Sequence, residues 1–492
     1  MRILLTGATG YIGSRLAPRL RSLGHQVRAL ARDPGKLLAK GWDPADVVRG
    51  DVLDPSTLPA AFSGVDVAYY LVHSMTTAGG DFAARDREAA RAFARAAAEA
   101  GVKRIVYLGG LGEAGAGLSE RLASRQETGD VLREGPVPVT ELRAAIIVGA
   151  GSASFEIVRD LARRLPVMVC PRWVSSRCEP IAVRDVLSYL AGVLDEPRTA
   201  GQVLEIGGGE VLTYADLMRV TGEVMGRRIR ILTVPLLTPR LSAYWLNLVT
   251  SVPMSLARPL VEGLRNDVVC RDRRIREWIP IPLTPFRAAV ERALEVDGRH
   301  AAESRWTDAT TTAASEPWPD GAPVLSDRRQ VESPLAPEAV FARVRRVGGA
   351  AGWYYADALW ELRGALDRLV GGVGMRRGRR DPEALAVGDP VDFWRVERYE
   401  EGRLLTLRAE MRLPGKARLT FRVNPGEGNG SVLTQVAEFH PSGLWGRLYW
   451  WALLPVHALI FGRMARAVAG VRRTAAPVRV SAAGCQDRLL PL

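Results

Sequence analysis

The stretch Thr6-Gly7-Ala8-Thr9-Gly10-Tyr11-Ile12-Gly13 decides the fold of the N-terminal half. It follows the apolar run Arg2–Thr6 and precedes a helical pattern, which predicts a turn between a buried strand and a helix. Gly7 permits a tight turn, Gly10 lets the backbone approach a pyrophosphate, and Gly13 lets the helix pack close to the strand. The phosphates would lie at the helix N-terminus, where free N–H groups and the helix dipole favour anions. The motif therefore predicts a dinucleotide site formed by Thr6, Gly7, Thr9, Gly10, Tyr11, Ile12 and Gly13.

Around this turn, short apolar runs alternate with helical patterns from residue 1 to about 195. Continuous apolar runs are typical of strands buried on both faces, and their alternation with helices implies parallel pairing. We therefore predict an α/β Rossmann domain with a doubly wound parallel sheet over residues 1–298, including a less regular substrate lobe over about 150–298. The strands are expected at Arg2–Thr6, Gln26–Ala31, Val65–Val72, Arg104–Leu108 and Val139–Val148.

The residue after the second predicted strand bears on the choice of dinucleotide. NAD-specific sites place Asp or Glu there to bind the ribose 2′-hydroxyl, whereas this chain has Arg32, followed one position late by Asp33. The Arg32 guanidinium could instead hold a 2′-phosphate through charge-assisted hydrogen bonds, with Asp33 serving only the turn. We therefore predict that NADP(H) is preferred over NAD(H).

Two further cofactor contacts are expected at Asp51 and Val52, after a third strand that lies between Gln26–Ala31 and the fourth strand, Val65–Val72. The Asp51 carboxylate is placed to accept a hydrogen bond from the adenine amine. By spacing alone, Asp51 could equally cap the helix that follows Asp54-Pro55.

The pattern changes after residue 298. Residues 299–325 lack apolar periodicity and are expected to form a linker, and residues 476–492 a C-terminal tail. Residues 326–475 are expected to form an α+β domain, in which an antiparallel meander precedes a long apolar helix at about Leu444–Val471. The strands of this meander are expected at Val387–Val396, Leu404–Met411, Ala417–Val423 and Ser431–Phe439.

The composition describes a globular protein with a basic surface. The chain has 492 residues, 47% hydrophobic and 25% charged, and a formal charge of +13 that is nearly all arginine. Such charge attracts an anionic membrane, a phosphorylated cofactor or nucleic acid, although a solvated arginine surface explains it as well. No zinc-finger, RNP or basic-zipper pattern accompanies it, so we expect no nucleic-acid partner.

The four cysteines, at positions 170, 178, 270 and 485, have neither zinc-ligand nor CxxC spacing. We therefore expect no metal site and a reducing, cytoplasmic location.

Two uncharged apolar stretches, Leu241–Ala257 and Leu448–Gly462, raise the question of membrane contact. Both are shorter than the roughly 20 residues that a spanning helix needs, and each contains a proline. They are expected either as buried core helices or as interfacial helices, with Trp450 and Trp451 at the headgroup level. The sequence leaves open whether the protein makes a peripheral contact with the inner face of the cell membrane.

Several N-terminal segments together resemble the atypical short-chain dehydrogenase/reductases, in particular the NmrA-like and complex-I 39-kDa-subunit-like branch. The resemblance covers residues 1 to about 295 and implies NAD(P) binding. Its segments are Thr6–Gly13, Val27–Asp33, Gly50–Asp54, Ala68–Ser74, Ile105–Gly112, Ile181–Val186 and Val203–Tyr214.

The C-terminal part, about 328–475, resembles a domain of unknown function that is often fused behind this reductase-like module. That domain is similar to the SRPBCC/START-like helix-grip folds, which commonly enclose an apolar ligand between a curved sheet and a long helix. Its marks here are Phe393–Glu397, Ala409–Met411, Pro414-Gly415 and Tyr449–Trp451.

The chain departs from the family at the catalytic set, which is Tyr-x-x-x-Lys plus a Ser. Arg121 and Arg125 occupy the tyrosine and lysine positions, and glycines, Gly109-Gly110, replace the serine. Arg125 could still hold ribose hydroxyls, but Arg121 cannot donate a proton near neutral pH because guanidinium stays charged.

Another acid would therefore be needed, and His73 and Ser74, after the fourth predicted strand, are the catalytic candidates. A structural histidine at a loop explains His73 as well. Tyr69 and Tyr70 are alternatives, although one of them must point into the core.

These observations predict an atypical NAD(P)-dependent oxidoreductase that binds NADP(H) and reduces an apolar carbonyl or quinone-like substrate. Loss of the tyrosine and serine favours an alternative, a non-catalytic NADPH-binding sensor or scaffold. A lipid-binding protein at the membrane surface is a further alternative. The expected partners are thus a small apolar substrate or a lipid-like ligand.

Overall fold

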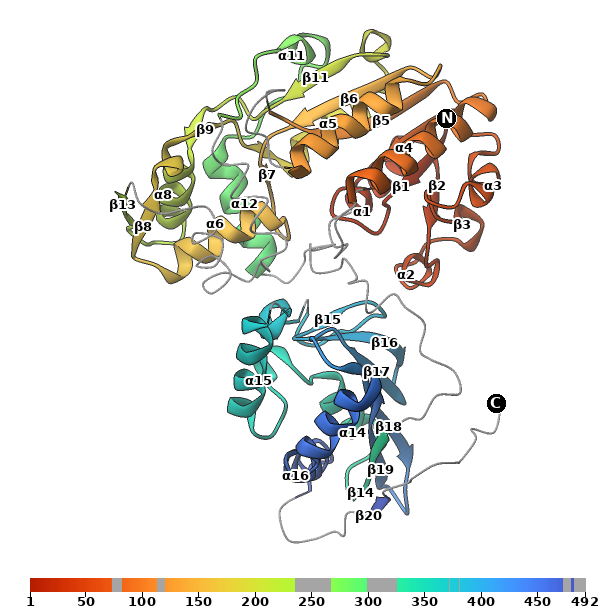
Figure 1. The fold of residues 1–492 in the computed structure, drawn as a ribbon, viewed down its shortest axis with the longest axis vertical. Coiled ribbons are helices and arrows are strands. Elements are labelled where there is room, and N and C mark those ends of the chain that lie inside the picture. The colour runs from red at the N-terminus through yellow and green to blue at the C-terminus, as the bar shows by residue number, and fades with distance from the viewer. Residues whose placement is uncertain are drawn as a thin grey trace. The chain divides into compact units, whose positions relative to one another are not determined.

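The computed structural model describes residues 1–72, 82–112, 120–234, 267–298, 325–370, 372–379, 381–471 and 479–481. The chain divides into two compact units, residues 1–309 and 310–492, and each is described by itself (Figure 1).

The first unit is built on a seven-stranded sheet in the order β11-β6-β5-β4-β1-β2-β3. Every neighbouring pair in this sheet is parallel, so the doubly wound Rossmann arrangement is confirmed. The strand order reverses between β1 and β4, which is where such folds bind their ligands. The strands are β1 (Arg2–Thr6), β2 (Gln26–Ala31), β3 (Val47–Arg49), β4 (Val67–Tyr70), β5 (Arg104–Gly110), β6 (Val139–Ala144) and β11 (Val203–Ile206).

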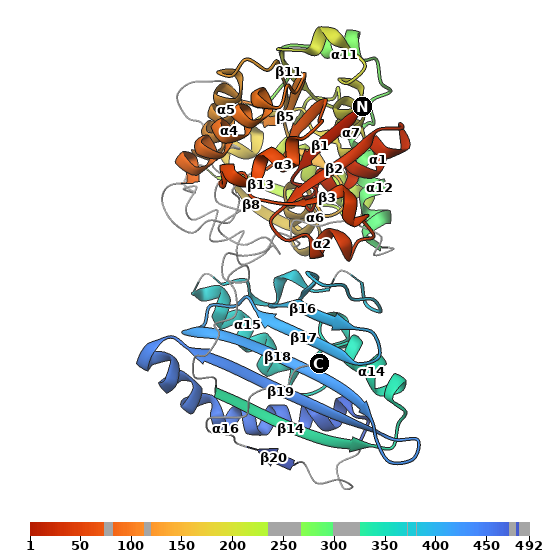
Figure 2. The same ribbon diagram turned by 90° about the vertical axis from the view of Figure 1, so that its right-hand side faces the viewer.

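Helices cover both faces of this sheet. Successive residues of a strand point to opposite faces, so apolar side chains on each face pack against helices. Ile3 and Leu5 of β1 pack with helices α1 (Gly13–Ser22) and α7 (Val183–Gly192). Leu4 between them packs on the other face, with α3 (Leu58–Phe62), α4 (Phe82–Glu99) and α5 (Glu120–Arg133). The short α2 (Gly35–Leu38) follows β2 (Figure 2).

The predicted strand Val139–Val148 is two strands in the structure. β6 ends at Ala144, and β7 (Ile147–Val148) leaves the main sheet to pair with β10 (Ile181–Ala182). Two further two-stranded sheets join β9 (Arg177–Cys178) to β12 (Leu212–Thr213) and β8 (Val167–Pro171) to β13 (Arg230–Val234). The helices of this lobe are α6 (Ala153–Arg164), α8 (Tyr214–Val224), α11 (Arg274–Trp278) and α12 (Phe286–Gly298).

Buried carboxylates fasten residues 267–298 to the rest of the lobe. Glu179 is fully buried and accepts hydrogen bonds from the amides of Gly209 and Cys270, both at 3.1 Å. Asp185 accepts from the amide and hydroxyl of Thr284 at 2.8 and 3.0 Å. This segment is therefore held by charge-assisted bonds to backbone as well as by apolar packing. The apolar stretch Leu241–Ala257 lies outside the described residues.

The second unit is the expected α+β domain. Its seven-stranded antiparallel sheet has the order β15-β16-β17-β18-β19-β14-β20. Its strands are β14 (Leu325–Ser333), β15 (Pro390–Val391), β16 (Trp394–Glu400), β17 (Leu404–Ala409), β18 (Gly415–Pro425), β19 (Ser431–Pro441) and β20 (Arg479–Ser481). Its helices are α14 (Pro337–Arg345), α15 (Asp357–Leu369) and α16 (Gly443–Val468).

The long helix α16 crosses the sheet beside β19 and β14 (Figure 2). Its last two turns enter the core of the unit, where Met464, Ala465 and Val468 are buried. The unit also contains a buried ion pair. Arg395 of β16 donates two hydrogen bonds to the carboxylate of Glu410, at 2.8 and 3.0 Å.

Candidate functional site

The glycine-rich turn has the backbone geometry that the sequence predicts. Gly7 has a φ of +69°, and a Cβ there would lie 2.6 Å from the carbonyl oxygen of Leu71. A Cβ on Gly13 would collide with the carbonyl oxygen of Gly7. Gly10 differs, because it is exposed and a Cβ there would come no closer than 3.1 Å to that same oxygen. Gly7 and Gly13 are thus required by the turn itself, and Gly10 keeps its outer surface bare.

The N-terminus of α1 is open to a ligand. Its N-cap, Ile12, provides no side-chain cap. Among the described residues, no hydrogen bond uses the amides of Tyr11, Ile12 and Gly13. Unpaired amides at the positive end of a helix dipole are suited to a diphosphate.

Thr6 and Tyr11 have structural contacts of their own. The Thr6 hydroxyl donates to the carbonyl oxygen of Tyr69 at 2.9 Å and accepts from the amide of Leu71 at 3.0 Å, so it ties β1 to β4. The Tyr11 ring lies under the guanidinium of Arg15, 4.2 Å from the ring centroid. The Tyr11 hydroxyl is buried, and burial raises its pKa. Thr9 is half-buried at the turn.

Sequence reasoning did not single out Arg15. It donates to the carbonyl oxygen of Tyr11 at 2.8 Å and to that of Ala150 at 3.1 Å, joining the first turn of α1 to the loop after β7. The sequence does contain a signal for this contact. Arg15 follows Tyr11 by four residues at the start of a helix, and residues four apart lie on the same face of a helix.

On the β2 side of the turn, Arg32 is exposed directly after the strand, and no described acid pairs with it. Asp33 accepts from the amide of Gly35 at 3.1 Å, so it serves the turn. Asp51 accepts from the amide of Leu53 at 3.1 Å. The helical turn at Pro55–Thr57 is capped by Asp54 and not by Asp51.

The side chain of Val52 is buried in the core beneath the third strand. A ligand bound over the edge of the sheet would therefore contact the backbone of Val52 and not its side chain.

On the β5 side, the structure brings Arg125 of α5 beside the strand end. A Cβ on Gly110 would lie 3.7 Å from its Cδ and 3.8 Å from its Nη1. The hydroxyl of Tyr107 donates to the carbonyl oxygen of Arg125 at 2.9 Å, which fixes α5 against β5. The Arg125 Nε atom is buried and has no partner among the described residues.

The tyrosine alternatives are wrong, because both rings enter the core on opposite faces of the sheet. The Tyr69 hydroxyl donates to the carbonyl oxygen of Leu190 at 2.6 Å, and Tyr70 packs edge-on against Phe93. Burial raises the pKa of both hydroxyls, so neither is suited to proton transfer at the sheet edge. The catalytic candidates His73 and Ser74, and the side chain of Arg121, lie outside the described residues.

Buried thiols are also unsuited to chemistry at this site. Burial raises the pKa of Cys170 to about 11 and that of Cys178 to about 12. In the described part of the chain, no group of three His, Cys, Asp or Glu side chains is arranged to hold a metal ion.

In the second unit, Trp450 agrees with the core-helix alternative for Leu448–Gly462 and not with a place at the headgroup level. Trp450 is buried and stacks on Phe439, with ring centroids 5.7 Å apart. Trp451 is exposed as expected, and so is Trp445 one helical turn and a half earlier. None of the described helices combines the length and the hydropathy that crossing a bilayer requires.

The parallel sheet, the bare glycine turn and the open helix end define a dinucleotide-binding protein. A family model described as "NAD(P)H-binding" matches residues 7–146, and one described as "Protein of unknown function (DUF2867)" matches residues 320–464.

Two curated relatives are both named reductases. The (4-alkanoyl-5-oxo-2,5-dihydrofuran-3-yl)methyl phosphate reductase of Streptomyces griseus is 31% identical over 235 residues, 46% of this chain and 75% of that protein. The ceramide reductase of Caulobacter vibrioides is 28% identical over 237 residues, 47% of this chain and 73% of that protein. The solved structure of the Citrobacter sp. triphenylmethane reductase complexed with NADP(H) covers 60% of this chain and 100% of its own, with 21% identity and a TM-score of 0.48.

The chain belongs to the NAD(P)-binding short-chain dehydrogenase/reductase family, with a fused C-terminal domain of unknown function. The resemblance found in the sequence is therefore confirmed. The START-like relationship of the second unit stays a prediction.

Proposed function

We propose that the protein is an NADP(H)-dependent reductase of an apolar carbonyl or quinone-like substrate. The observation that carries the proposal is the open N-terminus of α1 beside the bare Gly10, with the exposed Arg32 at the end of β2. The names of the two relatives, which both describe reductases, support the reaction class.

The residues present fit a phosphorylated dinucleotide. The amides of Tyr11, Ile12 and Gly13 would bind the diphosphate, and Arg32 would bind a 2′-phosphate through charge-assisted hydrogen bonds. The Asp51 oxygen that faces away from Leu53 would accept from the adenine amine, and Arg125 would hold ribose hydroxyls. When bound, the nicotinamide supplies a hydride to the substrate.

The proton for the substrate oxygen must come from a group other than the family tyrosine. Tyr69 and Tyr70 are committed to the core, and Arg121 at the tyrosine position stays charged. In the sequence, His73 and Ser74 follow Tyr70, the last residue of β4, after Leu71 and Val72. The end of β4 itself lies where the strand order reverses. We assign them the proton-donating role in this proposal, His73 first because its ordinary pKa lies near neutral.

The test is a titration with NADPH and with NADH, followed by cofactor oxidation with a panel of quinones and aldehydes, in wild type, Arg32→Ala and His73→Ala. Arg32→Ala should weaken NADPH binding roughly 10- to 100-fold, since hydrogen bonds to a charged group contribute about 1.5–3 kcal/mol, and should leave NADH nearly unchanged. Arg95→Ala, which removes an exposed arginine of α4, is the matched control.

Oxidation that disappears in His73→Ala supports the enzyme and its proton donor. Equal losses for both cofactors in Arg32→Ala would contradict the 2′-phosphate assignment. Tight binding with no oxidation of any acceptor would favour the sensor or scaffold.

The second unit supports a second function, contact with an anionic membrane surface. The first turns of α16 expose large apolar side chains, with Trp445 at 78% and Trp451 at 61% exposure. Leu362 and Leu366 of the neighbouring α15 are also exposed, and Arg363 of α15 reaches the hydroxyl of Tyr449 of α16 at 3.5 Å. Exposed tryptophan and leucine beside the exposed Arg447 and Arg463 are typical of a helix that lies in the headgroup layer.

Vesicle flotation tests this contact. The full chain should bind vesicles that contain phosphatidylglycerol and not those of phosphatidylcholine alone, and Trp445→Ser/Trp451→Ser should abolish the binding. Val167→Ser/Val169→Ser, which removes two exposed apolar side chains of the first unit, should leave it intact. Wild type that floats with neither vesicle would refute the proposal.

A further inference from the structure

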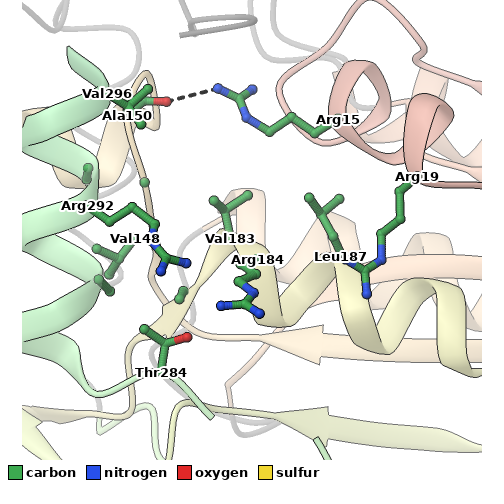
Figure 3. A pocket seen from close by; sticks show the side chains of 14 residues that line it. Arg15, Arg19, Val148, Ala150, Val183, Arg184, Leu187, Thr284, Arg292 and Val296 are labelled. Carbon is green, nitrogen blue, oxygen red and sulfur yellow. Dashed lines mark hydrogen bonds between the residues drawn. The ribbon is translucent and has the colours of Figure 1, made fainter. Parts of the chain in front are cut away.

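A cavity of about 370 Å³ lies in the first unit, between helices α1, α7 and α12 (Figure 3). It contains none of the residues assigned to the dinucleotide. Its apolar surface comes from Val148 of β7, Val183 and Leu187 of α7, and Val296 of α12.

Among the described residues, four arginines line this cavity and no acidic residue does: Arg15, Arg19, Arg184 and Arg292. Arg184 and Arg292 approach one another from α7 and α12 in Figure 3, and both are exposed without an ion-pair partner among the described residues. Two carboxylates are next to them in sequence. Asp185 is occupied by Thr284, and Glu291 forms no ion pair with Arg292 among the described residues.

A further donor without a partner among the described residues belongs to Arg19, which also lines the cavity. Arg19 donates from Nη2 to the hydroxyl of Ser188 at 3.1 Å, but its Nε is buried and has no partner in the described part of the chain. Helix α7 begins at Val183, on the cavity surface, and has no capping side chain. Clustered cations repel one another, a buried donor without a partner is costly, and an anion would relieve both.

We propose that this cavity binds a phosphate monoester that carries an apolar group. The Arg184 and Arg292 guanidinium groups would hold the phosphate oxygens in the bidentate manner that suits them, and Arg19 would complete the set. The apolar group would lie against Val183, Leu187 and Val296. The inference does not depend on the proposed function, because the groups that would bind the phosphate are not those assigned to the dinucleotide, although the cavity adjoins Tyr11 of the glycine turn through Arg15 and Gly149.

Calorimetric titration of the full chain with phenyl phosphate tests the site. Binding should be saturable, stronger than that of inorganic phosphate, and unchanged when NADP⁺ is present in excess. Arg184→Gln/Arg292→Gln should weaken it at least tenfold. The control is Arg85→Gln/Arg95→Gln, which removes the same charge from exposed positions of α4 and should have no effect.

Thermal melting of each variant, together with NADPH titration, shows whether it folds. Absence of binding, loss of binding when NADP⁺ is added, or equal affinity in Arg184→Gln/Arg292→Gln would each overturn the proposal. Loss of binding with NADP⁺, or equal affinity in the double variant, would mean that the phosphate binds outside this cavity.

The same chemistry occurs on soluble metabolites and on lipid headgroups, and a second arm separates these sources. Vesicles of phosphatidic acid that bind wild type and the α4 control, but not Arg184→Gln/Arg292→Gln, assign a lipid headgroup. Phenyl phosphate binding with vesicle binding equal in all three proteins assigns a soluble phosphate ester.

Discussion

At the scale of single residues, the three glycines of the turn are needed for different reasons. Gly7 and Gly13 are fixed by contacts inside the protein, since a Cβ at either position meets backbone carbonyl atoms. Gly10 is exposed, and a Cβ there would lie 3.1 Å from the carbonyl oxygen of Gly7, a tight contact but not a collision, so the fold constrains this position less. The structure therefore separates the requirement of the fold from the requirement of a ligand.

This separation predicts the behaviour of two variants. Gly10→Val should fold normally and lose NADPH binding, because the new side chain covers the surface that the diphosphate approaches. Gly13→Val should instead lower the stability of the first unit by roughly 1–3 kcal/mol or more, because the helix must move off the turn. Fluorescence titration and thermal melting measure the two effects, and a Gly10→Val protein with unchanged affinity would contradict the assignment.

At the scale of elements, α16 has two different halves. Leu444, Trp445 and Leu448 are exposed. The residues of α16 that pack into the core are Trp450, Ile460, Phe461, Met464, Ala465 and Val468. His457 lies between the halves, in contact with the rings of Trp450 and Phe461. Its Nδ1 is buried without a partner among the described residues.

This position predicts a pH dependence for the second unit. Burial lowers the pKa of His457, an effect that Asp327 opposes and Arg329 reinforces. The unfolded chain then takes up the proton more readily, so stability is lost as the pH falls below the ordinary histidine value of about 6.5. The loss is at most about 1.4 kcal/mol per pH unit, the limit for one proton.

Melting temperatures of the second unit between pH 7.5 and 5 measure this loss. His457→Phe, which keeps an aromatic ring between Trp450 and Phe461, should fall less steeply over that range than wild type. Parallel curves for the two proteins would rule out a contribution from His457.

At the scale of the whole molecule, each unit has its own sheet and its own hydrophobic core. We therefore predict two unfolding transitions in calorimetry. Glu410→Gln should lower only the transition of the second unit, because it removes the negative charge that is paired with the buried Arg395 guanidinium, at a cost of about 3–5 kcal/mol. Glu401→Gln, which breaks an exposed pair with Arg345, should cost about 1 kcal/mol or less.

NADPH should raise the other transition alone, since a ligand stabilises the unit that binds it. A single transition that moves with both treatments would show that the units unfold together.

The sequence predicts the elements whose signal is local. β1 and β2 have the expected bounds because continuous apolar runs end at clear turns. β14 is not among the strands that the sequence predicts, because Ser-Asp-Arg-Arg-Gln lacks an apolar pattern and the strand is held by pairing with β19. The sequence does not predict the split of Val139–Val148 into β6 and β7, because both parts are apolar and only the pairing of β7 with β10 separates them.

The candidate site divides in the same way. The glycine turn is a local motif, and its geometry follows from the residue type. The inward direction of Tyr69 and Tyr70, and the stacking of Trp450 on Phe439, depend on which face of an element meets the core. Because both neighbours are aromatic in each case, hydropathy alone could not distinguish them.

The buried carboxylates of the lobe have a consequence for a severed chain. Glu179 and Asp185 hold Cys270 and Thr284, which belong to residues that follow Val234 only after a long interval. If a protease cut once between Val234 and Asp267, the two pieces would stay together as a non-covalent pair. They would separate on a denaturing gel yet travel as one particle in native chromatography.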